Sequence, residues 1–194
     1  VSGNGVAYDK YTTGEATLFV TPGTPVEQIS FTTLTVDTTD DVVDGDTDSV
    51  DALIINPGED GLISLREAIE ATNNTERAFS IDFKSSLAGR TITLTEGQLT
   101  ITDDLTISGP DQKGVTISGG RRSRVFNVDD GNANLAKSVN FENLTISRGN
   151  TTSIGGGILN AENLTLKNSI GSGNQSGTRG GGIYNKLLAT LNLD

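Results

Sequence analysis

The chain contains 194 residues, carries a formal net charge of −11 at pH 7, and has no Cys, Met, Trp or His. The absence of Cys and His excludes disulfides, thiolate nucleophiles, imidazole bases and zinc sites built on these side chains. An isoelectric point near 4.3 argues against nucleic acid or an anionic membrane as a partner, and no stretch approaches the roughly 18 apolar residues of a membrane helix.

The acidic side chains are concentrated near the N-terminus. Residues 1–60 contain 12 acidic side chains and one basic side chain, whereas residues 61–194 contain 13 of each. We therefore divide the chain into an acidic N-terminal extension, residues 1–60, and a neutral domain, residues 61–194. Two strands are predicted in the extension, at residues 16–21 and 29–36. They could form a hairpin packed on the following domain, or they could be the end of a preceding domain.

A run of alternating carboxylates in the extension is a candidate calcium site. Asp44-Gly45-Asp46-Thr47-Asp48 has D-x-D-x-D spacing, and Asp51 follows shortly after. Such carboxylates on a looped backbone can converge on one hard cation, and calcium accepts roughly six to eight oxygen ligands. The closing Glu of an EF-hand loop is absent, and the alternative is a solvated acidic linker. The candidate ligands are Asp44, Asp46, Asp48 and Asp51.

One segment predicts a helix in an otherwise β-rich sequence. Ser64-Leu65-Arg66-Glu67 has the S-x-x-E form of a capping box, in which each end residue bonds the backbone of the other. The helix, over residues 65–72, would pair Arg66 with Glu70 and is too short to be stable alone. We expect its apolar face to cap the open end of the following domain. The face consists of Leu65, Ala68, Ile69 and Thr72.

From residue 91 onward, apolar triplets with a polar centre recur, and each predicts a short strand with both apolar ends facing inward. The triplets are Ile92-Thr93-Leu94, Leu99-Thr100-Ile101, Leu105-Thr106-Ile107, Val115-Thr116-Ile117, Leu144-Thr145-Ile146, Leu164-Thr165-Leu166 and Ala189-Thr190-Leu191.

The C-terminal part of the domain repeats itself. Gly155-Gly156-Gly157-Ile158-Leu159-Asn160 returns 25 residues later, as does Leu164-Thr165-Leu166, and Leu144-Thr145-Ile146 precedes Leu164-Thr165-Leu166 by 20 residues. Such a period indicates a solenoid, in which short parallel strands of successive coils stack around an apolar interior. The predicted fold is an all-β parallel β-helix of about 20–25 residues per coil with an N-terminal helical cap.

Four Asn residues fit the corners of such coils, namely Asn150, Asn160, Asn174 and Asn185. Asn tolerates the left-handed backbone of tight corners, and it can stack with an equivalent Asn one coil away. The alternative is ordinary surface loops.

The segment Ile63-Ser64-Leu65-Arg66-Glu67-Ala68-Ile69 resembles the signature of the C-S-L-R-E-A-I domain family of bacterial surface and secreted proteins. The resemblance extends over about residues 34–194, through the strands and the Gly-Gly-Gly-Ile repeats. It implies a capped right-handed parallel β-helix on a large exported protein, often adhesin-like and mostly without demonstrated activity. Ile63 stands where the name-giving Cys of the family stands, so a role for that Cys does not transfer.

Two charged patterns are candidates for catalysis. Arg121-Arg122-Ser123-Arg124 is the one basic cluster, and Arg can act as a base in lyases that resemble pectate lyase. Asp103-Asp104 and Asp129-Asp130 could be the paired carboxylates of a glycosidase. Adjacent strand residues point to opposite faces, however, so such pairs seldom converge, and we expect exposed corners with compensating charges.

An outward column of Thr is expected on one face, formed by Thr106, Thr145, Thr165 and Thr190. Hydroxyl arrays can order water or bind carbohydrate, and a flat array of two columns would suggest ice binding. Only one column is visible in the sequence, and high β-propensity also accounts for Thr on a solvated strand face.

These patterns together favour a non-enzymatic, exported bacterial module, secreted or at the cell surface, that presents a β-helical face to glycans, proteins or its own copies. The alternatives are a polysaccharide lyase or glycoside hydrolase of the β-helix type and an ice-binding protein. Calcium is the one expected cofactor. The sequence stops inside a strand pattern, which predicts further coils in a longer protein.

Overall fold

The computed structural model describes residues 9–13, 16–20, 32–111, 113–132 and 135–194. It divides into two units, residues 1–31 and residues 32–194. In the first unit, β1 (Asp9–Thr13) and β2 (Ala16–Val20) form an antiparallel hairpin. The predicted strand at 16–21 thus pairs with β1 and not with the strand predicted at 29–36. Residues 21–31, which include the predicted start of that second strand, lie outside the described residues.

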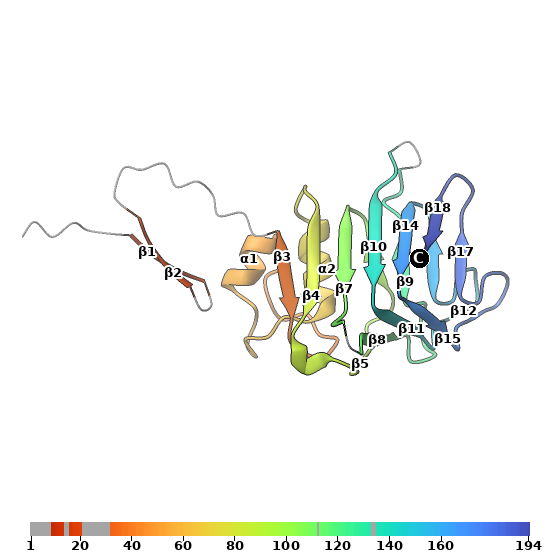
Figure 1. Ribbon diagram of the computed structural model, residues 1–194, viewed down its shortest axis with the longest axis horizontal. Coiled ribbons are helices and arrows are strands. Elements are labelled where there is room, and N and C mark those ends of the chain that lie inside the picture. Colours follow the sequence, from red (N-terminus) through yellow and green to blue (C-terminus); the bar gives the residue numbers. More distant parts are fainter. Residues whose placement is uncertain (1–8, 14–15, 21–31, 112, 133–134) are drawn as a thin grey trace, which may run out of the picture. The chain divides into compact units, whose positions relative to one another are not determined.

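The second unit is a right-handed parallel β-helix of about four turns. Its three main sheets run along the axis of the solenoid, as Figure 1 shows. The long sheet contains β3 (Thr33–Val36), β4 (Phe79–Phe83), β7 (Leu105–Ser108), β10 (Ser138–Glu142), β14 (Asn163–Lys167) and β18 (Thr190–Leu193). The second sheet contains β5 (Thr91–Thr93), β8 (Val115–Ser118), β11 (Leu144–Ser147) and β15 (Ile170–Ser172). The third contains β6 (Leu99–Ile101), β9 (Phe126–Val128), β13 (Ile158–Asn160) and β17 (Ile183–Asn185).

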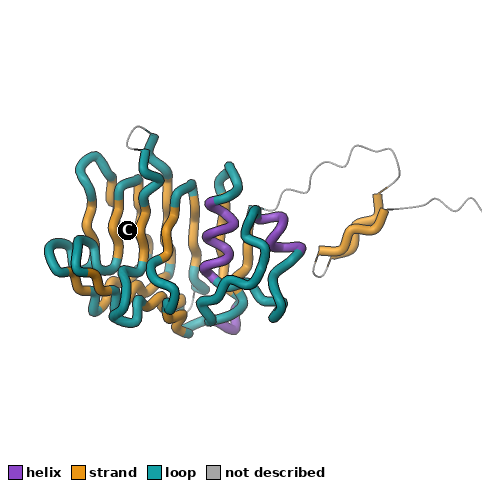
Figure 2. Tube along the Cα trace, turned by 180° about the vertical axis from the view of Figure 1, so that it is seen from behind, coloured by secondary structure: helices purple, strands orange, loops and turns teal. Residues whose placement is uncertain are grey.

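Three shorter elements and one pair of strands complete this unit. They are the helices α1 (Val50–Ile55) and α2 (Leu65–Asn73), a 3₁₀ turn at Ser85–Leu87, and the pair β12 (Asn150–Thr151) and β16 (Gln175–Ser176). Both helices lie at the N-terminal end of the solenoid, which Figure 2 shows from behind. Neither helix in the described part of the chain is long and apolar enough to cross a membrane.

Inward apolar side chains of successive coils stack in register and form the core. Ile92, Ile117 and Ile146 lie opposite one another in the second sheet, and all three are buried. The rings of Phe126 in β9 and Phe141 in β10 approach to 4.6 Å between centroids. The predicted parallel β-helix is therefore confirmed.

The repeat is less regular than the sequence predicts. Ile158 lies opposite Ile183, at the expected offset of 25 residues. Leu164, however, pairs with Leu191 and not with Ala189, because the corner before β18 is longer and contains Leu188 in a left-handed conformation, φ 75°. The predicted offset of 20 is wrong, because β14 pairs with β10, whereas Leu144 begins β11 in another sheet.

Helix α2 covers the N-terminal end of the coils, packing against β3, β6 and α1. Its Asn73 side chain donates to the Thr100 carbonyl (2.8 Å) and accepts from the Thr102 amide (2.9 Å). These bonds satisfy backbone groups at the edge of β6 that would otherwise be unpaired. The predicted apolar face is buried, and the segment from β3 to α1, which the sequence assigns to the extension, belongs to the same compact unit.

Candidate functional site

The acidic segment is fastened to α2 by a buried ion pair. Arg66 and Asp41 form two hydrogen bonds of 2.9 Å, and their side chains are 8% and 1% exposed. Arg66 also donates to the Gly97 carbonyl (2.9 Å), and Asp41 accepts from the Thr95 amide (2.6 Å). Burial opposes the charge on Asp41, but these bonds outweigh it and lower the pKa of the carboxyl below its usual value. Arg66 is thus paired with Asp41, whereas the sequence predicts Glu70.

Glu67 and Ser64 hold the same segment from the other side. The Ser64 hydroxyl accepts from the Glu67 amide at 3.1 Å, and Glu67 accepts from the Ser64 amide at 2.8 Å, which completes the capping box. Glu67 is fully buried and also accepts from the amides of Asp44 (2.9 Å) and Gly45 (2.8 Å). The Ser64 hydroxyl donates to the Val42 carbonyl (2.7 Å). The S-L-R-E segment therefore fixes the fold of the acidic segment.

The Asp41 carboxyl predicts a dependence of stability on pH. Its pKa is lower in the folded protein than in the unfolded chain, where it is about 3.9. The charged form therefore contributes stability above about pH 4, and this contribution is lost as the pH falls through the folded pKa. We expect the difference in free energy of unfolding between the native protein and Asp41→Asn to shrink from about pH 6 to about pH 3. Urea denaturation at each pH measures this difference. A difference that stays constant from about pH 6 to about pH 3 would contradict the lowered pKa of Asp41.

The four candidate calcium ligands have separate roles in the described structure. Asp44 accepts from the Glu59 amide (2.8 Å), Asp46 accepts from the Asp48 amide (3.2 Å), and Asp51 lies 3.8 Å from Arg77. Within the described residues, these four do not bring three carboxylate oxygens within 4.8 Å of one another. Calcium binding by this segment stays a prediction, which a comparison of melting temperatures in millimolar calcium and in chelator tests.

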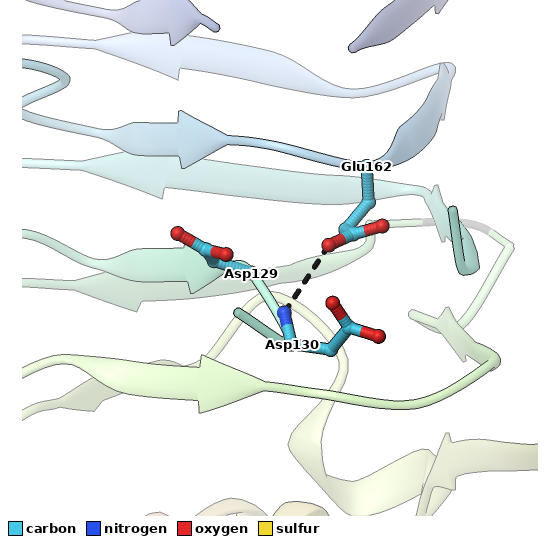
Figure 3. Close-up of side chains that lie close together, drawn as sticks. All are labelled: Asp129, Asp130 and Glu162. Carbon is cyan, nitrogen blue, oxygen red and sulfur yellow. Dashed lines mark hydrogen bonds between the residues drawn. The ribbon is translucent and has the colours of Figure 1, made fainter. Parts of the chain in front are cut away.

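One group of three carboxylates does converge in the described part of the chain, at a corner between the third sheet and the long sheet. One carboxylate oxygen from each of Asp129, Asp130 and Glu162 lies within 4.8 Å of the other two, and Figure 3 shows the three side chains. The expectation that Asp129 and Asp130 do not converge is therefore wrong. They follow β9 in a corner, where the alternation of a strand no longer applies.

These carboxylates are engaged in bonds that brace the corner. Glu162 accepts from the amides of Asp130 (3.1 Å) and Lys137 (2.8 Å). Asp129 forms an ion pair with Lys186, which lies two coils further on, and that bond lowers the pKa of the Asp129 carboxyl. Asp103 pairs with Lys137 in the same way, at 2.7 Å, which raises the pKa of the lysine. A glycosidase needs one of its carboxyls to carry a proton, whereas Lys186 favours the charged form of Asp129.

The four Asn residues occupy different positions in the coils. Asn160 lies opposite Asn185 and donates to its side-chain oxygen at 2.7 Å, so these two form a stacked pair. Asn150 lies opposite Gln175, and Asn174 accepts from the Gly149 amide (2.7 Å). The left-handed Asn residues in the described ranges are others, Asn143 and Asn168.

The predicted Thr column is divided between two sheets. Thr106 and Thr165 lie in the long sheet with Asn140 between them, and Thr190 pairs with Asn163 at its end. Thr145 lies in the second sheet. The prediction that these four residues form a single column is therefore wrong.

The outer face of the second sheet carries two rows of hydroxyl side chains instead. Strand pairing places the residues of each row opposite one another in successive coils. The first row is Thr91, Thr116 and Thr145, and the second row is Thr93, Ser118, Ser147 and Ser172. The sequence signal was the Thr-Ile-Thr or Thr-Ile-Ser motif at residues 91, 116 and 145, but the partner strands could not be recognised without the register.

These rows line a hollow of about 520 Å³, which we call the hydroxyl groove. The two central members of the second row, Ser118 and Ser147, are only 4% and 9% exposed and therefore lie deep in the groove. Arg121, Arg148 and Gly173 complete the lining, and no acidic side chain contributes to it. Sequence reasoning considered Arg121 only as part of a basic cluster.

The other arginines of that cluster lie elsewhere. Arg124 donates to the Gly155 (2.8 Å) and Ile154 (2.9 Å) carbonyls, and burial lowers its pKa. It therefore braces the glycine-rich corner, and Arg122 is exposed outside the groove.

No family model, curated protein or solved structure matches the chain.

Proposed function

We propose that the chain is a non-enzymatic bacterial module, secreted or at the cell surface, that binds glycans in the hydroxyl groove. The observation that carries this proposal is the pair of hydroxyl rows held in register along a groove of about 520 Å³. Each Ser or Thr hydroxyl both donates and accepts hydrogen bonds, as sugar hydroxyls do. The export and the bacterial source rest on the resemblance of residues 63–69 to the family of surface proteins.

The β-helix gives this groove the rigidity that recognition of a flexible polymer requires. Parallel strands lie about 4.8 Å apart. The two central strands of the groove, β8 and β11, are paired on both sides, and the stacked Ile core supports them from within. A polymer lying along the solenoid axis therefore meets a pair of hydroxyl side chains in each of three successive coils, those of β5, β8 and β11. Because the side chains stand on strands and not on loops, binding requires little ordering of the protein.

A pair of double variants tests the proposal on a glycan array. Thr116→Val/Thr145→Val removes two half-buried hydroxyls from the groove, and Thr106→Val/Thr165→Val removes two half-buried hydroxyls from the long sheet. We expect the native protein and the long-sheet variant to bind the same glycans, and the groove variant to lose at least about tenfold in affinity, since one hydrogen bond contributes about 1 kcal/mol. Absence of binding by the native protein, or equal binding by the groove variant, would contradict the proposal.

The two rows also favour a second candidate, ice binding, which needs a flat array of hydroxyls. The depth of Ser118 and Ser147 and the flanking Arg121 and Arg148 make the face concave and charged, which favours a glycan. Thermal hysteresis at micromolar protein concentration would show ice binding. Its absence would favour glycan binding over ice binding.

A further inference from the structure

We propose that the ligand of the hydroxyl groove is an acidic glycan, bound through its carboxylate or sulfate groups by Arg121 and Arg148. This inference rests on the proposed function and specifies its ligand. Both arginines line the groove, and they lie on neighbouring coils, because the Arg121 amide donates to the Arg148 carbonyl at 2.8 Å. The two arginines therefore occupy adjacent positions on successive coils, beside the hydroxyl rows.

The backbone at both arginines is left-handed, a conformation that is unfavourable for arginine and that glycine adopts without strain. Arg121 has φ 62° and Arg148 has φ 49°, in the left-handed region that costs a side chain roughly 1–2 kcal/mol. One coil further on, Gly173 has φ 63° and lines the same groove. The Arg148 amide donates to the Ser172 carbonyl at 3.0 Å, which places Arg148 and Gly173 at equivalent corners. Glycine occupies the equivalent corner without strain, so the presence of arginine at residue 148 indicates a role other than folding.

Both guanidinium groups are also unpartnered among the described residues. No hydrogen bond or ion pair joins the side chain of Arg121 or Arg148 to another described side chain or carbonyl, whereas Arg66 and Arg124 are each bonded to several groups. An arginine that stabilises a fold is expected to use its donors within the protein. Two positive charges on adjacent coils of one groove repel each other, and a bound anion reduces that repulsion.

The charge of the groove is opposite to that of the chain. The protein carries −11 overall, yet the lining contains two arginines, no carboxylate and otherwise uncharged residues. The excess acid lies in residues 1–60, part of which belongs to the same compact unit, whereas residues 61–194, which contain the whole groove, are formally neutral. Attraction of an acidic polymer therefore depends on the local charge of the groove. Guanidinium groups bind planar carboxylates and sulfates in a bidentate manner, while the hydroxyl rows can bind the sugar ring.

Matched polymers and variants test the inference with the full chain. The probes are polygalacturonate against its methyl ester, and dextran sulfate against dextran, so that each pair shares a sugar backbone and one member carries the negative charge. The groove variant is Arg121→Gln/Arg148→Gln, and the control is Arg122→Gln/Arg179→Gln, which neutralises two exposed arginines outside the groove. Titration calorimetry at about 50 mM and about 500 mM salt measures affinity and its screening.

We expect the native protein and the control to bind at least one acidic polymer about tenfold or more tightly than its uncharged partner. The groove variant should lose this preference and the salt dependence. Preference for polygalacturonate or for dextran sulfate identifies the acidic group. Equal binding of charged and uncharged polymers, lost only in Thr116→Val/Thr145→Val, would overturn this inference and leave the proposed function standing. Absence of binding to any of the polymers would overturn both this inference and the proposed function. Equal losses of affinity in the control and groove variants would show that general surface charge binds the polymer, which would overturn this inference.

Arg148→Gly separates binding from folding. Glycine relieves the left-handed backbone at this corner, so the melting temperature is expected to stay equal or to rise by up to about 4 °C. Affinity for the acidic polymer is expected to fall about tenfold. A lower melting temperature would show that the arginine stabilises the corner, which would overturn its assignment as a ligand-binding residue.

Discussion

Replacement of Arg66 by Met is expected to lower the free energy of unfolding by about 3–5 kcal/mol, because it leaves the Asp41 carboxylate buried without its counter-charge. The Asp41 side chain is 1% exposed, so water cannot replace the lost donors. Met keeps most of the length of the Arg side chain, which limits the cavity. Urea denaturation followed by circular dichroism measures the change.

Two further variants identify the cause of this loss. Lys167→Met removes a pair with Glu142 whose side chains are 52% and 34% exposed, and it should cost less than about 1 kcal/mol. Arg66→Met/Asp41→Asn removes both charges and should recover part of the loss, because the isolated buried charge is gone. A loss below about 1 kcal/mol in Arg66→Met would show that the ion pair does not hold the acidic segment in place.

Truncation of Phe126 to Ala is expected to destabilise the protein by about 3–5 kcal/mol, through lost burial and the cavity left behind. Phe126 is fully buried, pairs in register with Leu99 and Ile158, and contacts the ring of Phe141 at 4.6 Å between centroids. In a solenoid each coil is supported only by its neighbours, so a cavity here weakens the connection between the capped coil and the later ones.

The effect should appear as a lower melting temperature, by about 6–20 °C for a chain of this size. Phe126→Leu is the control, since it keeps an apolar side chain and should cost less than half as much. Ordinary thermal denaturation distinguishes the two variants. Equal melting temperatures for Phe126→Ala and the native protein would contradict the placement of Phe126 in the core.

The fold could be predicted because its information is local and repeated. An apolar triplet such as Leu99-Thr100-Ile101 reports a strand, the 25-residue return of the Gly-Gly-Gly-Ile segment reports a coil, and Ser64 with Glu67 reports the start of a helix. Each signal depends on residues close together in the sequence or on a fixed period. All of them agree with the structure.

The groove could not be predicted because the same local sequence occurs in two sheets. Leu105-Thr106-Ile107-Ser108 forms β7 of the long sheet, and Leu144-Thr145-Ile146-Ser147 forms β11 of the second sheet. The lengths of the corners decide which sheet each segment joins, and these vary from coil to coil. The Thr column was therefore built from residues of different faces, and the second row of hydroxyls was missed.

The partner of Arg66 was missed for a related reason. A helix places Glu70 one turn from Arg66, which makes it the obvious candidate. Asp41 lies 25 residues earlier and approaches Arg66 only because the acidic segment folds back over α2. Asp41 also accepts a hydrogen bond from the Thr95 amide. The buried position therefore favours Asp41 over Glu70 as the partner of Arg66. Which carboxylate pairs with Arg66 depends on tertiary packing, and a short-range sequence pattern does not report tertiary packing.

The most direct measurement of the central claim is a titration of isotope-labelled protein with short oligogalacturonates, followed by amide chemical shifts. We expect the largest shifts in β5, β8 and β11 and at Arg121 and Arg148, with little change in the long sheet or at the corner of Glu162. Shifts centred on the long sheet or on that corner, or no shifts with either acidic or uncharged oligosaccharides, would contradict the assignment of the hydroxyl groove as a glycan-binding site.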